Sequence, residues 1–176
     1  MLDLLVISHA CFTAINRNIY SLFQQDGWKV ELVVPKYLQF PSMLKQADPQ
    51  LDNDPPINFL DLVGNNPRSY HFEGLNDLLA DKKPAIVLLD NDPVSALAFQ
   101  VGSWCAKNGA RLYCISCENL SLGVLDTIRR RGVKSLPAAI YKRGLLYRSR
   151  PVVHGVFTIN KDGKESLVAK TKLACN

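Results

Sequence analysis

The sequence has no apolar run long enough to cross a bilayer, and its start lacks the basic segment and apolar core of a secretory signal. Residues 1–12 are largely apolar but include Asp3, and the chain turns polar by Asn16. The five cysteines form an odd count at scattered spacings, which disfavours a secreted disulfide framework. We therefore expect a cytoplasmic chain in a reducing compartment.

Glycine is missing from the turn that follows the first apolar run, because residues 8–13 read Ser-His-Ala-Cys-Phe-Thr. A dinucleotide-binding G-x-G-x-x-G turn and a P-loop both need glycines where the backbone approaches phosphate groups. Their absence argues against NAD-dependent enzymes and P-loop kinases. No cofactor is expected.

The sequence also lacks a convincing set of metal ligands. Cys114 and Cys117 have the spacing of a zinc ribbon, but no second pair accompanies them. Within or at the end of a strand, these two side chains would point to opposite faces. We expect no metal site.

Acidic residues are absent between Asp126 and Asp162, where nine basic residues fall. Such a block is typical both of a solvated surface and of a surface that binds an anionic partner such as phosphate, a membrane or nucleic acid. Its only aromatic residues before position 150 are Tyr141 and Tyr147, so base stacking is not indicated and no nucleic acid is expected. The candidate anionic contacts are Arg129, Arg130, Arg131, Lys134, Lys142 and Arg143.

The chain has 176 residues, 47% of them hydrophobic, which is enough for one sizeable core and hardly for two. Short apolar runs bounded by polar residues are typical of strands buried on both faces of a parallel sheet. Such runs occupy residues 2–8, 28–34, 57–60, 85–89, 111–116 and 152–159.

Helix patterns alternate with these runs. Thr13 is the expected N-cap of a first helix that turns Ile15, Ile19, Leu22 and Phe23 inward. Asp92-Pro93 is typical of a helix start, and further helices are expected at 72–79, 94–107, about 123–131, 136–148 and from 161 onward. Residues 36–56 show little periodicity and predict a long surface loop or a short irregular helix.

Alternation of strands and helices predicts an α/β, Rossmann-like doubly wound sheet, mainly parallel and flanked by helices. We expect one domain over residues 1–160, followed by a terminal helix over 161–176. In such sheets ligands bind beyond the carboxyl ends of the strands. That rule selects His9, Asn16, Arg17, Asp90, Glu118, Asn119, Asn160 and Lys161 as candidate cleft residues.

Each of these candidates has a plain alternative role. His9 could contact a ligand or act as a general base, but a lone histidine at a strand end is more often structural. Glu118 and Asn119 could bind sugar hydroxyls through paired hydrogen bonds, or simply form a turn. Asp92 is best explained as an N-cap, and Asp90 has no such local duty.

Several segments, in order, resemble the amino-terminal half of GT-B glycosyltransferases, with the family-4 retaining enzymes as the nearest likeness. The run 26–35 (DGWKVELVVP) is similar to the family's G-x-x-V-x-V-V-x-P strand, and 83–87 (KPAIV) to its K-P-D-I-V strand. Residues 4–9, 16–23 and Glu118-Asn119 fit the same order, and 158–163 (TINKDG) looks like its N-x-x-G strand end. The likeness covers essentially the whole chain.

The resemblance implies a two-domain enzyme that transfers a sugar from a nucleotide-sugar to a glycan or lipid-linked acceptor, as in polysaccharide or lipopolysaccharide synthesis. This chain would be the acceptor-side domain, inactive alone, because the E-x7-E motif and the Arg/Lys pair of the donor domain are missing. By resemblance, Glu118-Asn119 would contact sugar or acceptor, and His9 with Arg17 acceptor or phosphate; no general base is assigned. The basic segment 129–150 would suit peripheral docking on the inner face of an anionic membrane.

Two other functions fit the residues. The first is a stand-alone flavodoxin-like ligand-binding domain without catalysis, which a reading frame that ends at Asn176 would favour. The second is a basic surface-binding module for nucleic acid, which the sparse aromatic residues disfavour. A reading frame that continues for a comparable length would favour the transferase.

Overall fold

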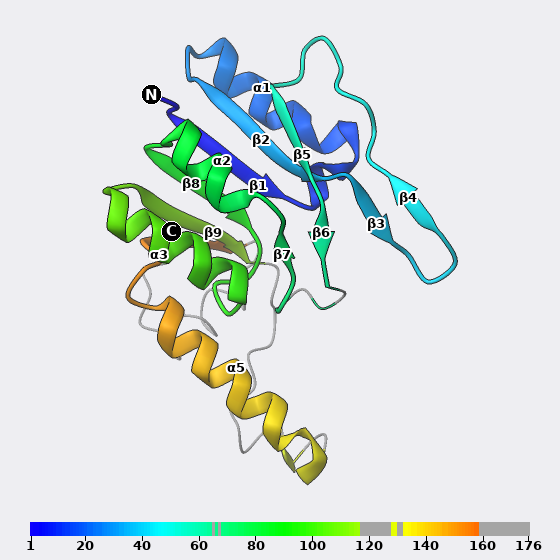
Figure 1. The fold of residues 1–176 in the computed structure, drawn as a ribbon, viewed down its shortest axis with the longest axis vertical. Helices are drawn as coiled ribbons and strands as arrows, with labels where there is room; N and C mark the ends of the chain where they lie inside the picture. Colours follow the sequence, from blue (N-terminus) through cyan, green and yellow to red (C-terminus); the bar gives the residue numbers. More distant parts are fainter. Residues whose placement is uncertain (65, 67, 117–127, 130–131, 159–176) are drawn as a thin grey trace.

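The computed structural model describes residues 1–64, 66, 68–116, 128–129 and 132–158. In this part a six-stranded sheet has the order β10-β9-β8-β1-β2-β5, and all its neighbouring strands run parallel (Figure 1). Counting only these strands along the chain, the order from the β5 edge is 3-2-1-4-5-6, that of the Rossmann fold. Flavodoxin-like domains have the order 2-1-3-4-5. The predicted Rossmann-like fold is confirmed.

The strand bounds follow the apolar runs closely. The predicted strands at 57–60 and 111–116 are confirmed to the residue, and the others differ by a few residues at their ends. The six strands are β1 (Leu4–Ser8), β2 (Val30–Pro35), β5 (Ile57–Leu60), β8 (Ile86–Asp90), β9 (Arg111–Ser116) and β10 (Gly155–Thr158).

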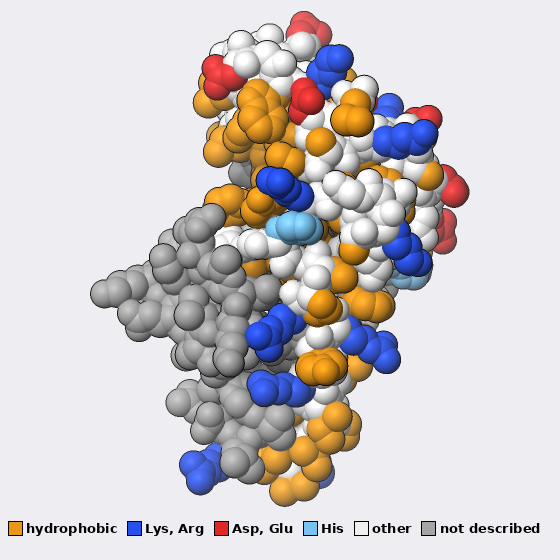
Figure 2. All heavy atoms as spheres, turned by 90° about the vertical axis from the view of Figure 1, so that its left-hand side faces the viewer, with side chains coloured by type: hydrophobic (Ala, Val, Ile, Leu, Met, Phe, Trp, Pro, Cys, Tyr) orange, Lys and Arg blue, Asp and Glu red, His pale blue; other side chains and the backbone are white. Residues whose placement is uncertain are grey.

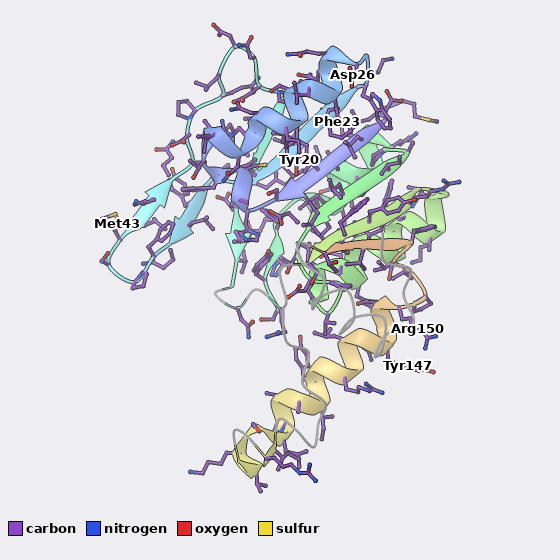
Figure 3. The ribbon with its side chains drawn as sticks, turned by 180° about the vertical axis from the view of Figure 1, so that it is seen from behind. Tyr20, Phe23, Asp26, Met43, Tyr147 and Arg150 are labelled. Atoms are coloured by element: carbon purple, nitrogen blue, oxygen red, sulfur yellow. The ribbon has the colours of Figure 1, made fainter. Side chains whose placement is uncertain are left out.

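The sheet is buried on both faces. Leu5 and Ile7 of β1 belong to one hydrophobic cluster and Leu4 and Val6 to the other, because successive side chains of a strand point to opposite faces. Helices α2 (Leu75–Lys82) and α3 (Ala96–Asn108) cover the first face, and α1 (Asn18–Gln25) covers the second. Figure 1 shows α2 and α3 in front of the sheet, and Figure 3 shows α1 from behind.

The first helix is shorter than predicted and faces differently. Two 3-10 turns, η1 (Ala10–Phe12) and η2 (Ala14–Arg17), precede it, and Thr13 makes no side-chain cap. Ile15, Ile19 and Leu22 are each more than half exposed, so their predicted inward placement is wrong. The inward positions hold Tyr20, at 7% exposure, and the fully buried Arg17, which a hydropathy pattern reads as a surface residue.

Helix α3 also begins later than predicted, and Asp92 does not cap it. The N-cap is Ser95, whose Oγ accepts a hydrogen bond from the backbone N of Ala98 at 3.0 Å. Serine is among the best N-caps because its short side chain reaches the free N–H groups of the first turn. Asp92 is therefore available for another role.

Residues 36–56, predicted as a loop or irregular helix, contain a hairpin of β3 (Tyr37–Gln39) and β4 (Leu44–Gln46). A second small antiparallel pair, β6 (Leu62–Val63) and β7 (His71–Phe72), follows β5. Both pairs are separate from the main sheet. The hairpin projects from the side of the molecule where the parallel strands end (Figure 1).

The predicted helix at 136–148 is confirmed as α5 (Leu136–Ser149), preceded by the turn η3 (Val133–Ser135). Leu145 packs against Val94, and the Arg148 guanidinium lies over the Phe99 ring at 5.9 Å. The other end of α5 projects away from the sheet (Figure 1). The helices predicted around 123–131 and from 161 onward lie almost entirely outside the described residues.

Two helical glycines give a matched pair of stability predictions. A Cβ on Gly102 of α3 would lie 2.6 Å from Val152 Cγ2 and 3.0 Å from its carbonyl oxygen, whereas a Cβ on Gly144 of α5 would meet nothing within 4 Å. We expect Gly102→Ala to cost about 1–3 kcal/mol through overpacking. Gly144→Ala should stabilise by up to about 1 kcal/mol through helix propensity.

Urea unfolding of both glycine variants beside the parent chain measures this difference. Opposite signs are the expected result. A destabilised Gly144→Ala, or a neutral Gly102→Ala, would contradict the close packing of α3 against the segment that follows α5.

Candidate functional site

The strand order reverses between β1 and β8, and in doubly wound sheets this switch point is where ligands bind. Ser8 and Asp90 end these two strands and face each other in the parallel register. Ser8 Oγ donates a hydrogen bond to Asp90 Oδ2 at 2.7 Å. Asp90 is partly buried, and Ser8 is almost fully buried. This carboxylate–hydroxyl pair marks the centre of the candidate site.

The Ser8 hydroxyl also occupies the first turn after β1. It accepts hydrogen bonds from the backbone N–H groups of Ala10 at 3.1 Å and Cys11 at 3.2 Å. In phosphate-binding Rossmann turns, such N–H groups and the helix N-terminus point at the phosphate. Here the two N–H groups donate to Ser8 Oγ instead, and the first α-helix, α1, begins only at Asn18. The turn is built to hold a side chain.

A second polar group continues along the same edge. Asn91 donates from Nδ2 to the Tyr70 hydroxyl at 3.0 Å and accepts from the backbone N of Asp92 at 2.8 Å. Ser116, at the end of β9, donates to Asp92 Oδ1. Carboxylates and hydroxyls from the ends of three neighbouring strands therefore share one edge.

Tyr70 connects this polar edge to a pocket. Burial raises the pKa of its phenol, and the Asp90 and Asp92 carboxylates raise it further, so the hydroxyl stays protonated. The pocket has a volume of about 310 Å³, at the small end of the range for ligand sites. It is lined by His9, Tyr37, Leu38, Gln39, Leu44, Asp61, Leu62, Gly64 and Tyr70.

Of the cleft residues predicted from the sequence, the structure brings His9 and Asp90 to this region. His9 is exposed and lines the pocket, and Asp90 lies at the switch point. Asn16 is exposed, but its Nδ2 donates to the Ala10 carbonyl at 2.7 Å, which ties the two 3-10 turns together.

Arg17 has a different role from the predicted contact with acceptor or phosphate. Its side chain is fully buried, and all five of its N–H groups have acceptors. One acceptor is the Asp54 carboxylate at 2.9 Å, and the others are four backbone carbonyls. No donor is left for a ligand, so Arg17 is structural. The four carbonyls belong to Cys11, Phe12, Asp48 and Pro49.

Other predicted residues cannot be placed. Glu118, Asn119, Asn160 and Lys161 lie outside the described residues, as do Arg130, Arg131 and the side chain of Lys142. Arg129, Lys134 and Arg143 are exposed. Over α5, the surface seen in Figure 2 carries basic and apolar side chains but no acidic ones.

Two parts of the site were missed by the sequence reasoning. The Asp92-Pro93 pattern predicts Asp92 as an N-cap, but the cap is Ser95, another good N-cap residue two positions after Pro93. Tyr70 reaches the site from the segment just before β7, and in the sequence it follows no strand of the main sheet directly, so no local pattern indicates it.

Among the described residues, no group of three or more His, Cys, Asp or Glu side chains is arranged to hold a metal ion. In the same part of the chain, no helix is long and apolar enough to pass through a bilayer. No protein-family model matches the sequence, and no curated protein matches it either.

Proposed function

We propose that this chain is the acceptor-side domain of a glycosyltransferase that moves a sugar from a nucleotide-sugar to a glycan or lipid-linked acceptor. The observation that carries the proposal is the Ser8–Asp90 pair at the switch point between β1 and β8. Sugar hydroxyls both donate and accept hydrogen bonds, and an edge of carboxylate, amide and hydroxyl groups suits them.

The first turn supports a division of labour between two domains. Since Ser8 uses the amides of Ala10 and Cys11, the turn offers them to no donor diphosphate. We infer that a second domain, beyond this chain, binds the nucleotide-sugar and that turnover needs both halves. A cleft between them would stabilise the leaving diphosphate electrostatically.

Within this half, Asp90 is the residue that we assign to a sugar hydroxyl. Ser8 fixes one carboxylate oxygen, Oδ2, and among the described residues nothing donates to Oδ1, which is free to accept from a ligand. His9 and Tyr70 line the adjoining pocket and would contact the rest of the acceptor. We assign no general base.

Saturation-transfer NMR on the 176-residue chain tests this assignment. Methyl glycosides of glucose, galactose, mannose and N-acetylglucosamine serve as acceptor probes, and UDP-glucose and GDP-mannose as donors. We expect signals from at least one glycoside and none from the donors. Asp90→Asn should weaken glycoside binding about tenfold or more, because it removes a charge-assisted hydrogen bond without changing the side-chain shape.

The matched control is Asp81→Asn. Asp81 is exposed and lines a hollow with Met1 and Lys29 at the amino ends of the strands, opposite the candidate site. Its replacement should therefore leave glycoside binding unchanged. Micromolar donor affinity by calorimetry would overturn the division of labour. An Asp90→Asn variant that binds glycosides normally would overturn the acceptor site.

The basic surface of α5 and its flanking residues supports a peripheral location on an anionic membrane. Lys134, Arg143 and Arg150 are exposed, and no acidic residue occurs between positions 126 and 162. Basic residues near an anionic bilayer contribute roughly 1 kcal/mol each. We propose that this surface holds the enzyme beside a membrane-borne acceptor.

A further inference from the structure

The β3–β4 hairpin presents apolar side chains to solvent. Tyr37, Phe40, Met43 and Leu44 are between 39% and 61% exposed. Phe40 also faces the Phe12 ring of the body at a centroid distance of 6.4 Å. Figure 3 shows Met43 at the far end of the hairpin. Packing within the described chain does not account for this apolar tip.

The hairpin has a tight, defined shape. Its register pairs Tyr37 with Gln46 and Gln39 with Leu44, and the Phe40 backbone N donates to the Met43 carbonyl at 2.8 Å across the Pro41-Ser42 turn. The apolar side chains are therefore held at the tip of an ordered element. An apolar tip that is already ordered can insert into a lipid bilayer without a further folding step.

The charge carried by the hairpin itself has one sign. Residues 32–47 contain no Asp or Glu, and Lys45 Nζ lies over the Phe40 ring at 5.3 Å. Lys36, at the base, is paired with Asp61. A lysine beside aromatic and aliphatic side chains is typical of residues at a membrane interface, where the stem lies in the apolar layer and the ammonium among the headgroups.

Helix α5 shares this arrangement. It projects below the sheet, whereas the hairpin projects at the right of the sheet, and both slope toward the lower right in Figure 1. Ile140 and Tyr147 are exposed beside Arg143, and Figure 3 shows Tyr147 near the end of this helix and Arg150 just beyond it. Two projections with apolar and basic side chains and no acidic ones are complementary to an anionic bilayer. A second copy of this chain would oppose like charges.

We propose that the β3–β4 hairpin is a membrane-contacting loop that inserts Phe40, Met43 and Leu44 into the surface of an anionic bilayer, with Lys45 at the headgroups. This contact is separate from the basic surface of α5, which acts through charge. Tyr37, Leu38 and Leu44 also line the pocket at His9. The inserted hairpin would thus place the pocket at the bilayer surface. That the pocket then binds a lipid-linked acceptor rests on the proposed function.

Vesicle co-sedimentation of the 176-residue chain tests the hairpin without any sugar transfer. The vesicles are phosphatidylcholine alone or mixed with phosphatidylglycerol. We expect binding to the mixed vesicles, and about a tenfold or greater loss in the triple variant Phe40→Ser/Met43→Ser/Leu44→Ser, because apolar insertion provides much of the affinity. Circular dichroism should show that the variant remains folded.

The matched control replaces the exposed apolar residues of the first helical segment, as Ile15→Ser/Ile19→Ser/Leu22→Ser. These side chains are 57–72% exposed, against 39–61% for the three hairpin residues, but their neighbours on the segment are mainly Asn, Ser and Gln. We expect unchanged vesicle binding. A loss in this control, with normal binding by the hairpin variant, would assign the membrane to the α1 surface and overturn the proposal.

Salt separates the hairpin from α5. Vesicle binding that depends on Lys134 and Arg143 should weaken at high salt, so the variant Lys134→Glu/Arg143→Glu should lose the salt-sensitive component. The component that the hairpin variant loses should persist at high salt. Met43→Trp fluorescence should be quenched by lipids brominated in their acyl chains, and that of Leu51→Trp, in the loop before β5, should not. Equal quenching, no binding to any vesicle, or a dimer that the hairpin variant dissociates would each overturn the proposal.

Discussion

Replacing Arg17 with methionine is expected to destabilise the protein by about 3–5 kcal/mol, the usual cost of breaking a buried ion pair on one side. The Arg17 and Asp54 side chains are 0% and 3% exposed. Without the guanidinium, the Asp54 carboxylate would stay buried with no cationic partner, and four backbone carbonyls would lose a donor. At roughly 2–4 °C per kcal/mol for chains of this size, the unfolding temperature should fall by on the order of 10 °C.

Lys36→Met is the matched control for Arg17→Met. Lys36 and Asp61 form an ion pair of almost the same length, 3.0 Å, but their side chains are 45% and 49% exposed. Exposed pairs contribute at most about 1 kcal/mol. Arg17→Lys should recover only part of the stability lost in Arg17→Met, since an ammonium has three N–H donors for the five acceptors that surround Arg17. Equal unfolding temperatures for Arg17→Met and Lys36→Met would contradict the structural role of Arg17.

Arg17 also explains why the first helix was predicted in the wrong orientation. The pattern of Ile15, Ile19 and Leu22 predicts an inward apolar face, and it assigns arginine to the outside. In the fold, Arg17 joins the two 3-10 turns to residues 48–54, which lie far along the chain. A contact of this kind depends on tertiary structure, so local periodicity could not reveal it.

The main sheet was predictable for the opposite reason. A strand of a parallel sheet that is covered on both faces needs apolar residues at successive positions, and β1 is buried throughout. The runs at 57–60 and 111–116 come shortly after Pro55-Pro56 and Asn108-Gly109, which interrupt regular structure, and their bounds were predicted correctly. General rules for βαβ units restrict the strand order to a few possibilities, and the structure shows which of them is present.

The candidate site was predictable only where it coincides with a strand end. His9 and Asp90 follow from the rule that ligands bind beyond the carboxyl ends of parallel strands. Tyr70 and the hairpin residues enter the pocket through the connections between strands, and no rule of periodicity places those. The Ser8–Asp90 hydrogen bond, which joins positions 82 residues apart, likewise required the fold.

The largest pH effect is expected on the alkaline side, where buried thiols should make the protein unfold. Burial raises the pKa of Cys105 to about 12, from an ordinary value of 9.0. Burial also raises the pKa of Cys11 and Cys114. All three are free thiols at 0–1% exposure. Below pH 9 the thiols are protonated in both the folded and the unfolded chain, so their full contribution to the free energy of unfolding is present. Above pH 9 only the unfolded chain loses these protons readily.

Stability should therefore fall as the pH rises from about 9 toward the folded pKa values, by about 1.4 kcal/mol per pH unit for each thiol. By about pH 11, Cys105 alone would cost roughly 2–3 kcal/mol. Urea unfolding under reducing conditions across this range measures the slope. Cys105→Ala should lower stability at neutral pH, because it leaves a small cavity, yet flatten the alkaline slope. An unchanged slope in that variant would show that Cys105 ionises as easily in the folded protein as in the unfolded chain, against its burial on the inner side of α3.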